Sequence, residues 1–478
     1  MSDFEHRASR KKFPTAIFVL VVFVAALLAG GYVLAPRFER EAPVIAVTPD
    51  SDLLGPAPIE IGVTDRGAGL KSVTATLSAG GTEHPLATDV YATPVGEKKM
   101  GLAVAKLAGI KEGAAVLRVR ARDASLWKWF GGNETVLEKQ VTIDLTPPAI
   151  ELVAEDRYIN FGGVGAIVYK SSADTQTSGV KVGNDFFPGY KGQAKGQPDH
   201  YFALFAHPYN AAAEAKALLV ATDKAGNTRE LPLVYELKNV KYRKSTIAIS
   251  DRFIQSSVAP LLKGASAREG GAKEVFLAVN NRLRKENDDR IAAITKKSAP
   301  TMLWKGAFVQ LSNSKVEANF ADERTYTYNG EPIDKAHHLG YDLSVTKRYP
   351  VEAAHSGKVA FAGDLGIYGS TVMLDHGLGL FTLYSHLSSI DVKEGDAIEQ
   401  RHILGRTGET GLAAGDHLHY GVYLHGVAVL PVEWWDAKWI KDNIEPKLEG
   451  LSGEAIAELQ APRKAARRPP PKRRQASR

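Results

Sequence analysis

The sequence predicts a mainly β protein that begins with one apolar helix and contains a short helical region before its last domain. Three observations predict this. Short runs of alternating apolar and polar residues, such as Val73–Leu77 and Val116–Arg120, fill much of the chain between Gly and Asp turns. One uncharged apolar run lies near the N-terminus. Between Ile249 and Lys297, apolar residues recur at helical spacing.

The apolar run from Phe13 to Leu34 contains no charged residue, and about 20 apolar residues are enough to span a bilayer as a helix. Four basic residues precede the run, whereas the basic residues that follow it are balanced by acidic ones. The positive-inside rule then places residues 1–12 in the cytoplasm, a single-pass transmembrane anchor at 13–35 and the rest of the chain outside. A cleaved signal peptide is the alternative, but its apolar region is normally about 7–15 residues long.

Residues 43–146 and 147–240 are each predicted to form a small β-sandwich module. The joint between them contains Pro147 and Pro148, and a double proline cannot continue a β-ladder. The segment Ala217–Thr228 resembles the closing strand and turn of bacterial immunoglobulin-like repeats. The chain has no cysteine and therefore no disulfides to brace these modules. We expect two immunoglobulin-like spacers or docking modules without chemistry of their own.

Residues 241–300 are predicted to be a helical linker region. Apolar residues recur there every three or four positions among charged ones, as in an amphipathic helix: Val275, Leu277, Ala278, Leu283 and Ile291. Such a helix either joins two domains or packs over a neighbouring groove and regulates it. Joining is the interpretation that we favour.

Nine of the 13 histidines lie in the last third of the chain. Imidazole and carboxylate are the ligands that zinc selects when no thiol is present. Alternate residues of a strand share a face, so His417 and His419 are expected to project together, as are His338 and Asp342. His338, Asp342 and one of the other two would supply three protein ligands and leave a fourth position for water. That is the arrangement of a catalytic zinc site.

The remaining histidines of this region, apart from His386, are interpreted as structural or surface residues: His337, His355, His376, His402 and His425. His337 directly precedes a proposed ligand. No His-Glu-x-x-His sequence occurs in the chain, which excludes the helical zinc-protease motif as the basis of the site.

Residues from about Trp304 to Asp436 resemble peptidase family M23 (LytM/lysostaphin type), the zinc endopeptidases of bacterial cell walls. The resemblance rests on seven segments in the order and spacing of the family: HLGYD at 338–342, YPVEAAHSGKVAFAG at 349–363, YGSTVMLDHG at 368–377, LYSHLSSI at 383–390, VKEGDAI at 392–398, LGRTGETG at 404–411 and GDHLHYGV at 415–422. It implies an antiparallel β-sheet peptidase domain, assigned to residues 301–445.

By this resemblance His338, Asp342 and His419 bind zinc, while His386 and His417 are the catalytic histidines. All five positions are filled, as in a member that cleaves its substrate. His417 is a candidate general base for the attacking water, and His386 a candidate donor to the oxyanion or the leaving amine.

Two positions depart from the family pattern. Gly421 stands two residues beyond the zinc-binding histidine, where Glu is frequent, so the carboxylate that commonly orients such a ligand is absent there. Ala321 stands where Gly is common. Arg324, in the same approach to the first ligand, either lines the substrate groove or is an ordinary surface charge.

Residues 446–478 are predicted to be a disordered basic tail. Ala461 to Arg478 contains eight Lys and Arg residues and no acidic one, so the net charge of +6 would be 6 − 8 = −2 without it. Outside a membrane, the partners of such a tail are anionic wall polymers, lipid headgroups or an acidic protein. Nucleic acid is not expected as a partner in that compartment.

The sequence thus predicts a membrane-anchored zinc metallo-endopeptidase that hydrolyses peptide bonds in peptidoglycan stems or cross-links. It would be a single-pass protein of the bacterial inner membrane with its catalytic domain on the periplasmic side. Two alternatives stand beside this. One is a LytM-type binding module that activates a separate wall amidase without cutting, and the other is a protease acting on an envelope protein.

Overall fold

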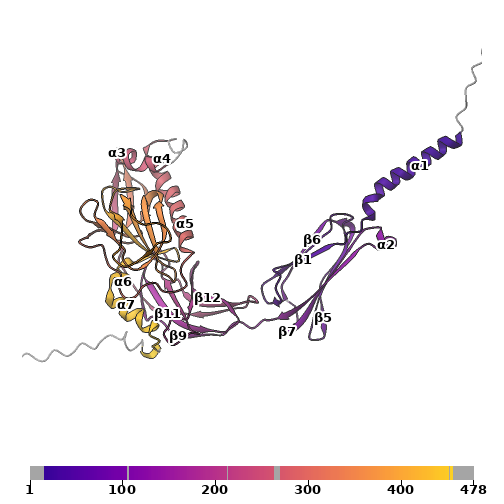
Figure 1. Cartoon of the computed structure of the whole chain (residues 1–478), viewed down its shortest axis with the longest axis horizontal. Helices are drawn as coiled ribbons and strands as arrows, with labels where there is room; N and C mark the ends of the chain where they lie inside the picture. Colours follow the sequence, from indigo (N-terminus) through magenta and orange to yellow (C-terminus); the bar gives the residue numbers. More distant parts are fainter. Residues whose placement is uncertain (1–14, 105–106, 213, 263–269, 452, 456–478) are drawn as a thin grey trace, which may run out of the picture. The chain divides into compact units, whose positions relative to one another are not determined.

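The computed structural model describes residues 15–104, 107–212, 214–262, 270–451 and 453–455 (Figure 1). The chain divides into two compact units. One comprises residues 1–147 together with 223–227, and the other comprises residues 148–222 and 228–478. The first unit contains the N-terminal helix and the first β module. The second contains the other β module, the helical region and the last domain.

The predicted N-terminal helix is present as α1 (Thr15–Leu34), and a 3-10 turn, η1 (Ala35–Phe38), follows it. In the part of the chain that the structure describes, no helix has both the length and the apolarity needed to cross a membrane. The helix is therefore confirmed, over a shorter range than 13–35, whereas the transmembrane span is not. The predicted cytoplasmic segment, residues 1–12, lies outside the described residues.

Two sheets form the β module of the first unit, as the alternating pattern predicts. The three-stranded sheet contains β1 (Val44–Thr48), β3 (Ile59–Thr64) and β6 (Glu97–Leu102). The five-stranded sheet contains β2 (Leu53–Leu54), β8 (Glu134–Ile143), β7 (Gly113–Asp123), β4 (Leu70–Ala79) and β5 (Thr82–Val95). Alternate residues of β7 are buried, among them Leu117 and Val119, because alternate side chains of a strand point to the same face.

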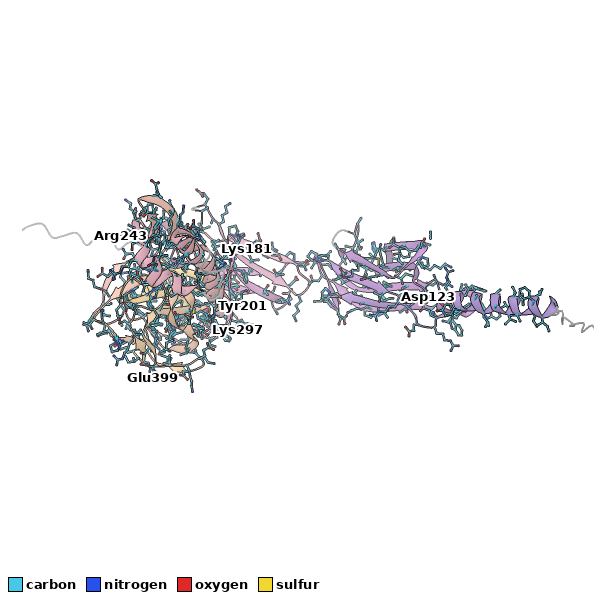
Figure 2. All side chains as sticks on the ribbon, turned by 90° about the horizontal axis from the view of Figure 1, so that it is seen from above. Asp123, Lys181, Tyr201, Arg243, Lys297 and Glu399 are labelled. Atoms are coloured by element: carbon cyan, nitrogen blue, oxygen red, sulfur yellow. The ribbon has the colours of Figure 1, made fainter. Side chains whose placement is uncertain are left out.

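The loop between β7 and β8 is closed by Asp123, the last residue of β7, which Figure 2 labels. Its Oδ1 atom accepts hydrogen bonds from the backbone N–H groups of Ser125 at 3.0 Å and Asn133 at 2.7 Å. Between these residues lies α2 (Trp127–Phe130), a single turn in which three residues have positive φ. One buried carboxylate thus fixes both ends of this loop.

Two four-stranded sheets form the β module of the second unit. One contains β14 (Tyr190–Lys191), β15 (Tyr201–Ala206), β11 (Val164–Ser171) and β9 (Ile150–Ala154). The other contains β13 (Asp185–Pro188), β12 (Thr175–Val182), β16 (Ala217–Asp223) and β17 (Thr228–Pro232). A short parallel pair, β10 (Tyr158–Asn160) and β18 (Glu236–Lys238), lies outside these sheets. The apolar core of this module is continuous with that of the last domain.

An eight-stranded antiparallel sheet forms the centre of the last domain, as the resemblance implies. Its strands are, in spatial order, β20 (Lys315–Ala318), β23 (Tyr341–Ser344), β31 (Leu418–Leu424), β27 (Leu380–Leu387), β26 (Ser370–Asp375), β25 (Gly357–Asp364) and β29 (Ala397–Ile398), with β32 (Val427–Val429) paired to β31. A smaller sheet joins β24 (Pro350–Glu352), β30 (Ile403–Arg406) and β28 (Ser389–Ile390). β27 and β31 are buried along their whole length, so they are the rigid centre from which the site is built.

The region predicted as a helical linker begins with a strand. β19 (Lys244–Ile249) pairs in parallel with β21 (Glu323–Tyr328), and β21 pairs with β22 (Glu331–His337). The predicted helical segments follow: α3 (Asp251–Phe253), η3 (Ile254–Val258), η4 (Ala259–Leu261), α4 (Ala272–Leu277), η6 (Ala278–Leu283) and α5 (Arg284–Thr295). Figure 1 shows α5 alongside the last domain, where Asn287 Oδ1 accepts a hydrogen bond from Ile367 N at 2.9 Å. This region is therefore part of the last domain rather than a joint between two domains.

The chain leaves the last domain through three short helices, α6 (Pro431–Trp435), α7 (Ala437–Asn443) and α8 (Glu445–Leu448). The predicted start of the disordered tail at 446 is too early, because Lys447 is fully buried and its Nζ lies 2.5 Å from Asp156 Oδ1 in the second β module. Residues 456–478, which include the basic run, lie outside the described residues.

Replacing Lys447 with Met should destabilise the second unit by about 3–5 kcal/mol, because it leaves the buried Asp156 carboxylate without its cation. Thermal and urea unfolding of the purified protein would measure this. Lys441→Met, at an exposed position on α7, is the control and should change stability by less than about 0.5 kcal/mol. Equal stability of the two variants would show that the Lys447–Asp156 pair contributes little.

Glu433 on α6 makes a second link to the β module. It is buried, and its carboxylate accepts hydrogen bonds from Asn160 Nδ2 at 2.7 Å and Val164 N at 2.9 Å. Burial raises the pKa of Glu433 to about 8, although both hydrogen bonds oppose the shift. In the folded protein the side chain is therefore mostly protonated at neutral pH.

The raised pKa of Glu433 makes folding stability dependent on pH. Its contribution should be complete below the pKa of an unfolded Glu, about 4.3, and be lost as pH rises through about 8. We expect the free energy of unfolding to fall by a few kcal/mol over this range. In Glu433→Gln that fall should be much smaller, whereas Glu449→Gln at an exposed position should keep it. Urea unfolding at pH 5, 7 and 9 tests this, and identical pH profiles for wild type and Glu433→Gln would contradict it.

Candidate metal centre and catalytic site

Three neighbouring strands bring the predicted ligands together. β31 lies between β23 and β27, and in this register His419 is paired with Asp342 on one side and with Ser385 on the other. Directly paired residues of antiparallel strands have Cβ atoms about 4.5–5.5 Å apart. The sheet therefore places Asp342 beside His419, although 77 positions separate them in the sequence.

His338 joins the group from the loop that leads into β23. β22 ends at His337 and β23 begins at Tyr341, so His338 lies at the strand end. Its backbone is fixed on both sides, since His338 N donates to Asp322 O at 3.0 Å and its carbonyl oxygen accepts from Ala321 N at 2.7 Å. Ala321 has a φ of 56°, in the left-handed region that favours glycine. That conformation explains why glycine suits this position.

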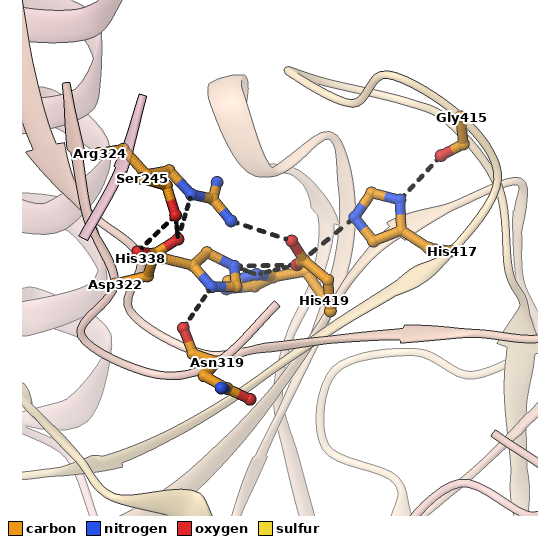
Figure 3. Close-up of polar contacts among 9 residues, drawn as sticks. Ser245, Asn319, Asp322, Arg324, His338, Gly415, His417 and His419 are labelled. Atoms are coloured by element: carbon orange, nitrogen blue, oxygen red, sulfur yellow. Dashed lines mark hydrogen bonds and ion pairs between the residues drawn. The ribbon is translucent and has the colours of Figure 1, made fainter. Parts of the chain in front are cut away.

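The three donor atoms lie within about 3 Å of one another (Figure 3). His338 Nε2 is 2.9 Å from Asp342 Oδ1 and 2.9 Å from His419 Nδ1, and His419 Nδ1 is 3.0 Å from Asp342 Oδ1. Zn–N bonds of about 2.0–2.1 Å put the ligand atoms of a tetrahedral site roughly 3.3 Å apart. Two imidazole nitrogens and one carboxylate oxygen at this spacing fit a divalent metal such as zinc.

Hydrogen bonds and packing decide which nitrogen each ligand histidine presents. His338 Nδ1 donates to Asn319 O at 2.9 Å, which leaves the lone pair of Nε2 for a metal. His419 presents Nδ1 instead, and its buried Nε2 has no hydrogen-bond partner among the described residues. Gly421, two positions on, has no side chain to supply one. His419 is therefore held by packing, including the ring of Tyr368 with its centroid 5.6 Å away.

The electrostatics of the group favour the protonation state that binds a metal. Burial raises the pKa of Asp342, but the neighbouring histidines outweigh it, foremost His338, and hold the pKa well below its usual range. Burial lowers the pKa of His419 to about 4, against the opposing effect of Asp342. At neutral pH the group thus offers an ionised carboxylate and a neutral imidazole at His419, as metal binding requires.

Two further histidines, His386 and His417, lie beside this group of three donor atoms. Their Nδ1 atoms donate to backbone carbonyl oxygens, those of Thr410 and Gly415 respectively, each at 2.7 Å. Both Nε2 atoms remain for the reaction, and the ring centroids are 4.8 Å apart. His417 Nε2 lies 3.5 Å from Asp342 Oδ1. The two imidazoles predicted to be catalytic therefore lie beside the three predicted ligands.

His386 and His417 differ in how readily they gain a proton. Burial, together with the neighbouring His417 and His419, lowers the pKa of His386 to about 3. Burial also lowers the pKa of His417, but the hydrogen bond and the negative charge of Asp342 outweigh it, so that this pKa is raised. Near pH 7, His386 is a neutral imidazole with an acceptor at Nε2, and His417 exchanges its proton more readily.

His386 also has an unusual backbone. Its φ is 63°, a conformation that residues with side chains seldom adopt. The residue lies near the end of β27, one position after Ser385, which is the partner of His419. Strict alternation would direct Ser385 and His386 to opposite faces, so the alternating pattern of the sequence does not predict the placement of His386 at the site.

Arg324 lies at the site and is not an ordinary surface charge. Its Nη2 is 3.2 Å from Asp342 Oδ2, and its Nε is 3.6 Å from Asp322 Oδ2. Ser245 Oγ donates to the Asp322 carboxylate at 2.8 Å. Figure 3 shows Arg324 and His417 reaching in from opposite sides. Arg324 thus pairs with Oδ2 of Asp342, whereas the histidines contact Oδ1.

One cavity with a volume of about 280 Å³ is lined by Arg324 and by the five predicted site residues, His338, Asp342, His386, His417 and His419. Further lining residues come from η7 (Gly366–Tyr368), from the loop 412–414 and from the β19–α5 region. Its volume is near the lower end of the range for ligand sites, about 300–1,000 Å³, and suits a short section of a peptide. Tyr368 and the residues from β19 to α5 are not among the site residues that the sequence predicts.

Residues 336–431 match the model of peptidase family M23. This segment belongs to that family. It contains all five predicted site residues, His338, Asp342, His386, His417 and His419.

The relatives of the M23 segment include proteins that are named as endopeptidases. The DD-carboxypeptidase/endopeptidase Mpg of Neisseria meningitidis serogroup B is 39% identical over 95 residues, which are 20% of this chain and 22% of that protein. The peptidoglycan DD-endopeptidase ShyA of Vibrio cholerae serotype O1 is 32% identical over 117 residues, 24% of this chain and 26% of that protein. The matched region thus spans about a quarter or less of either relative.

Part of the chain is also similar to a solved structure. The catalytic domain of the antimicrobial peptidase lysostaphin from Staphylococcus simulans is 28% identical, with a TM-score of 0.22, and the match covers 26% of this chain and 92% of that one.

The other histidines of the M23 segment are structural or surface residues, as predicted. His376 is buried between Ser356 O and Thr382 Oγ1, each 2.7 Å from one of its ring nitrogens. His355 Nε2 lies 3.0 Å from Lys305 O, and His425 stacks on Tyr190. His337 and His402 are exposed. None of these five histidines lines the cavity that contains the site.

Proposed function

We propose that this protein is a zinc metallo-endopeptidase that hydrolyses peptide bonds in peptidoglycan stems or cross-links. The observation that carries the proposal is the group of three donor atoms 2.9–3.0 Å apart, with two further oriented imidazoles in the same cavity. Three protein ligands leave one position open, which distinguishes a catalytic zinc site from a structural one. The name of the relative ShyA, a peptidoglycan DD-endopeptidase, supports peptidoglycan as the substrate.

Each residue has a defined task in this proposal. His338, Asp342 and His419 hold zinc, which when bound acts as a Lewis acid that activates water and polarises a carbonyl oxygen. His417 and His386 present Nε2 to the cavity, where one accepts the proton of the attacking water and the other donates to the oxyanion or to the leaving amine. Arg324 fixes the Asp342 carboxylate through its second oxygen, and the carbonyl oxygens of Thr410 and Gly415 fix the tautomers of the two catalytic imidazoles.

Digestion of purified sacculi by the full chain tests this function. We expect zinc close to one per chain and release of muropeptides that mass spectrometry assigns to hydrolysis of one type of peptide bond. Bound zinc without cleavage of sacculi would refute the wall hydrolase. In that case cleavage of envelope proteins and activation of a purified amidase would separate the two alternatives. All five site positions are filled, and this favours cleavage over a purely binding role.

An envelope location belongs to the same proposal, because peptidoglycan lies outside the cytoplasmic membrane. Attachment to the inner membrane through the N-terminal segment, with the catalytic domain in the periplasm, stays a prediction from the sequence, as does an anionic or acidic partner for the basic tail. Fractionation of cells into cytoplasm, periplasm and membranes, with detection of the tagged protein, would test the location. Recovery in the cytoplasm alone would exclude peptidoglycan as the substrate.

A further inference from the structure

One wall of the catalytic cavity is built by residues that precede the M23 segment. Ile247 and Ile249 of β19, Phe253 of α3, Phe276 of α4 and Arg284 of α5 all line it. Phe276 is fully buried, and its ring meets that of Tyr326 in a T-shaped contact with the centroids 5.0 Å apart. This wall is mostly apolar, and Arg284 is its charged member.

The wall is fixed to the domain by many contacts. β19 pairs with β21 over six residue pairs. The side chains of Asn280 and Asn281 both donate to Asp334 Oδ2 at 2.8 Å. Tyr368 Oη donates to Asp288 Oδ1 at 3.2 Å. These contacts anchor α4–α5 at several points, so the position of Arg284 relative to the catalytic residues is defined by the fold.

Arg284 is oriented by a neutral partner. Its Nη2 donates to Asn280 Oδ1 at 2.8 Å, and its Nε lies 3.2 Å from both Asn280 O and Asn280 Oδ1. Among the described residues it forms no ion pair, whereas Arg324, the other arginine of the cavity, pairs with Asp322 and Asp342. The nearby Asp288 is engaged by Tyr368. The charge of Arg284 acts on Asp288 at a distance, where it lowers the pKa of that carboxyl against the larger effect of burial. A half-buried guanidinium whose hydrogen-bond partner is neutral has donors left for an anion.

We propose that Arg284 is a specificity residue that binds a carboxylate of the substrate inside the cavity. The inference rests on the proposed peptidase function and adds the chemical class of peptide that the site prefers, one with a free carboxylate rather than an amidated one. A guanidinium matches a carboxylate geometrically and forms strong charge-assisted hydrogen bonds with it. The apolar residues around Arg284 exclude water from that contact and strengthen it.

Two synthetic peptidoglycan stem peptides, identical except that the acidic residue carries either a free carboxylate or a primary amide, provide the test. Wild type should cleave the carboxylate peptide with the higher kcat/KM. Arg284→Gln should lower kcat/KM for that peptide by about 10- to 100-fold, mainly through KM, and change little for the amide peptide. Arg284→Lys should recover part of the preference. Arg282→Gln, on the preceding exposed turn, is the matched control and should behave as wild type.

The proposal is overturned if Arg284→Gln keeps the wild-type preference or lowers cleavage of both peptides equally. Binding of the same two peptides to metal-free protein, followed by calorimetry, separates this outcome from failure of the proposed function. If wild type cleaves neither peptide but binds the carboxylate form more tightly, and Arg284→Gln abolishes that difference, the specificity assignment holds without the endopeptidase activity. Equal affinity of wild type for both peptides would refute the assignment.

Discussion

His419→Ala should abolish stoichiometric zinc binding and lower hydrolysis of sacculi by about 10³-fold or more, the effect of several kcal/mol of lost transition-state stabilisation. His419 is the ligand at the centre of the sheet, paired with Asp342 on one side and Ser385 on the other. Without its imidazole only His338 and Asp342 remain of the group of three ligands. Zinc analysis and muropeptide release on one sample would measure both effects.

The matched control for His419→Ala is His337→Ala. His337 is an exposed histidine next to a proposed ligand at the end of β22, and its ring makes a tilted contact with that of Tyr209, with the centroids 5.2 Å apart. Its loss should leave zinc content and hydrolysis within about twofold of wild type, the range expected for a change worth less than 0.5 kcal/mol. Full zinc content in His419→Ala, or loss of zinc in His337→Ala, would show that the metal lies elsewhere.

His386→Ala and His417→Ala should lower kcat by about 10²- to 10⁴-fold while zinc content stays near one per chain, because neither residue belongs to the group of three ligands. The double variant should have nearly the activity of the less active single variant, because the effects of residues that act as a unit in catalysis are not additive. Steady-state kinetics on a defined peptide, with zinc determined on each preparation, would show this.

The same kinetics separate the roles of the two histidines. The pKa of His417 is raised and that of His386 is lowered to about 3, so they contribute differently to the dependence of kcat/KM on pH. His402→Gln, at an exposed position away from the cavity, is the control. Retention of wild-type kcat in either alanine variant would remove that residue from the catalytic machinery.

Most of the site was predictable from the sequence because its residues come from short motifs on adjacent strands. Alternation along β31 and the spacing of His417 and His419 predict that both side chains point the same way, and both line the cavity. The M23 segments supply the remaining three positions. The spacing of apolar residues in the two β modules likewise predicts their sheets, because burial of one face leaves a period of two in the sequence.

Other features depend on long-range contacts and have no local signal. The φ of 63° at His386 follows from the way β27 ends, not from the residues around it. The helical region shows amphipathic spacing, but that spacing cannot tell which surface the apolar face will cover. The residues of β19 were predicted to belong to the helical region. They form a strand because they pair with β21, which lies more than 70 positions away in the sequence. The sequence did not distinguish a surface position for Arg324 from one at the site. Its place beside Asp342 depends on the position of β21 in the fold.

The contacts at both ends of the last domain determine how much chain is needed to build the active site. A fragment cut at the limits of the family match, 336–431, would omit β19 and β21, and with them Arg324 and the wall that contains Arg284. It would expose the edges of the remaining strands, which are prone to pair with other chains. Glu433 and Lys447, which bind residues of the preceding β module, would also be missing. The smallest piece that retains a complete cavity therefore runs from about residue 148 to 451, roughly three times the length that sequence similarity alone marks out.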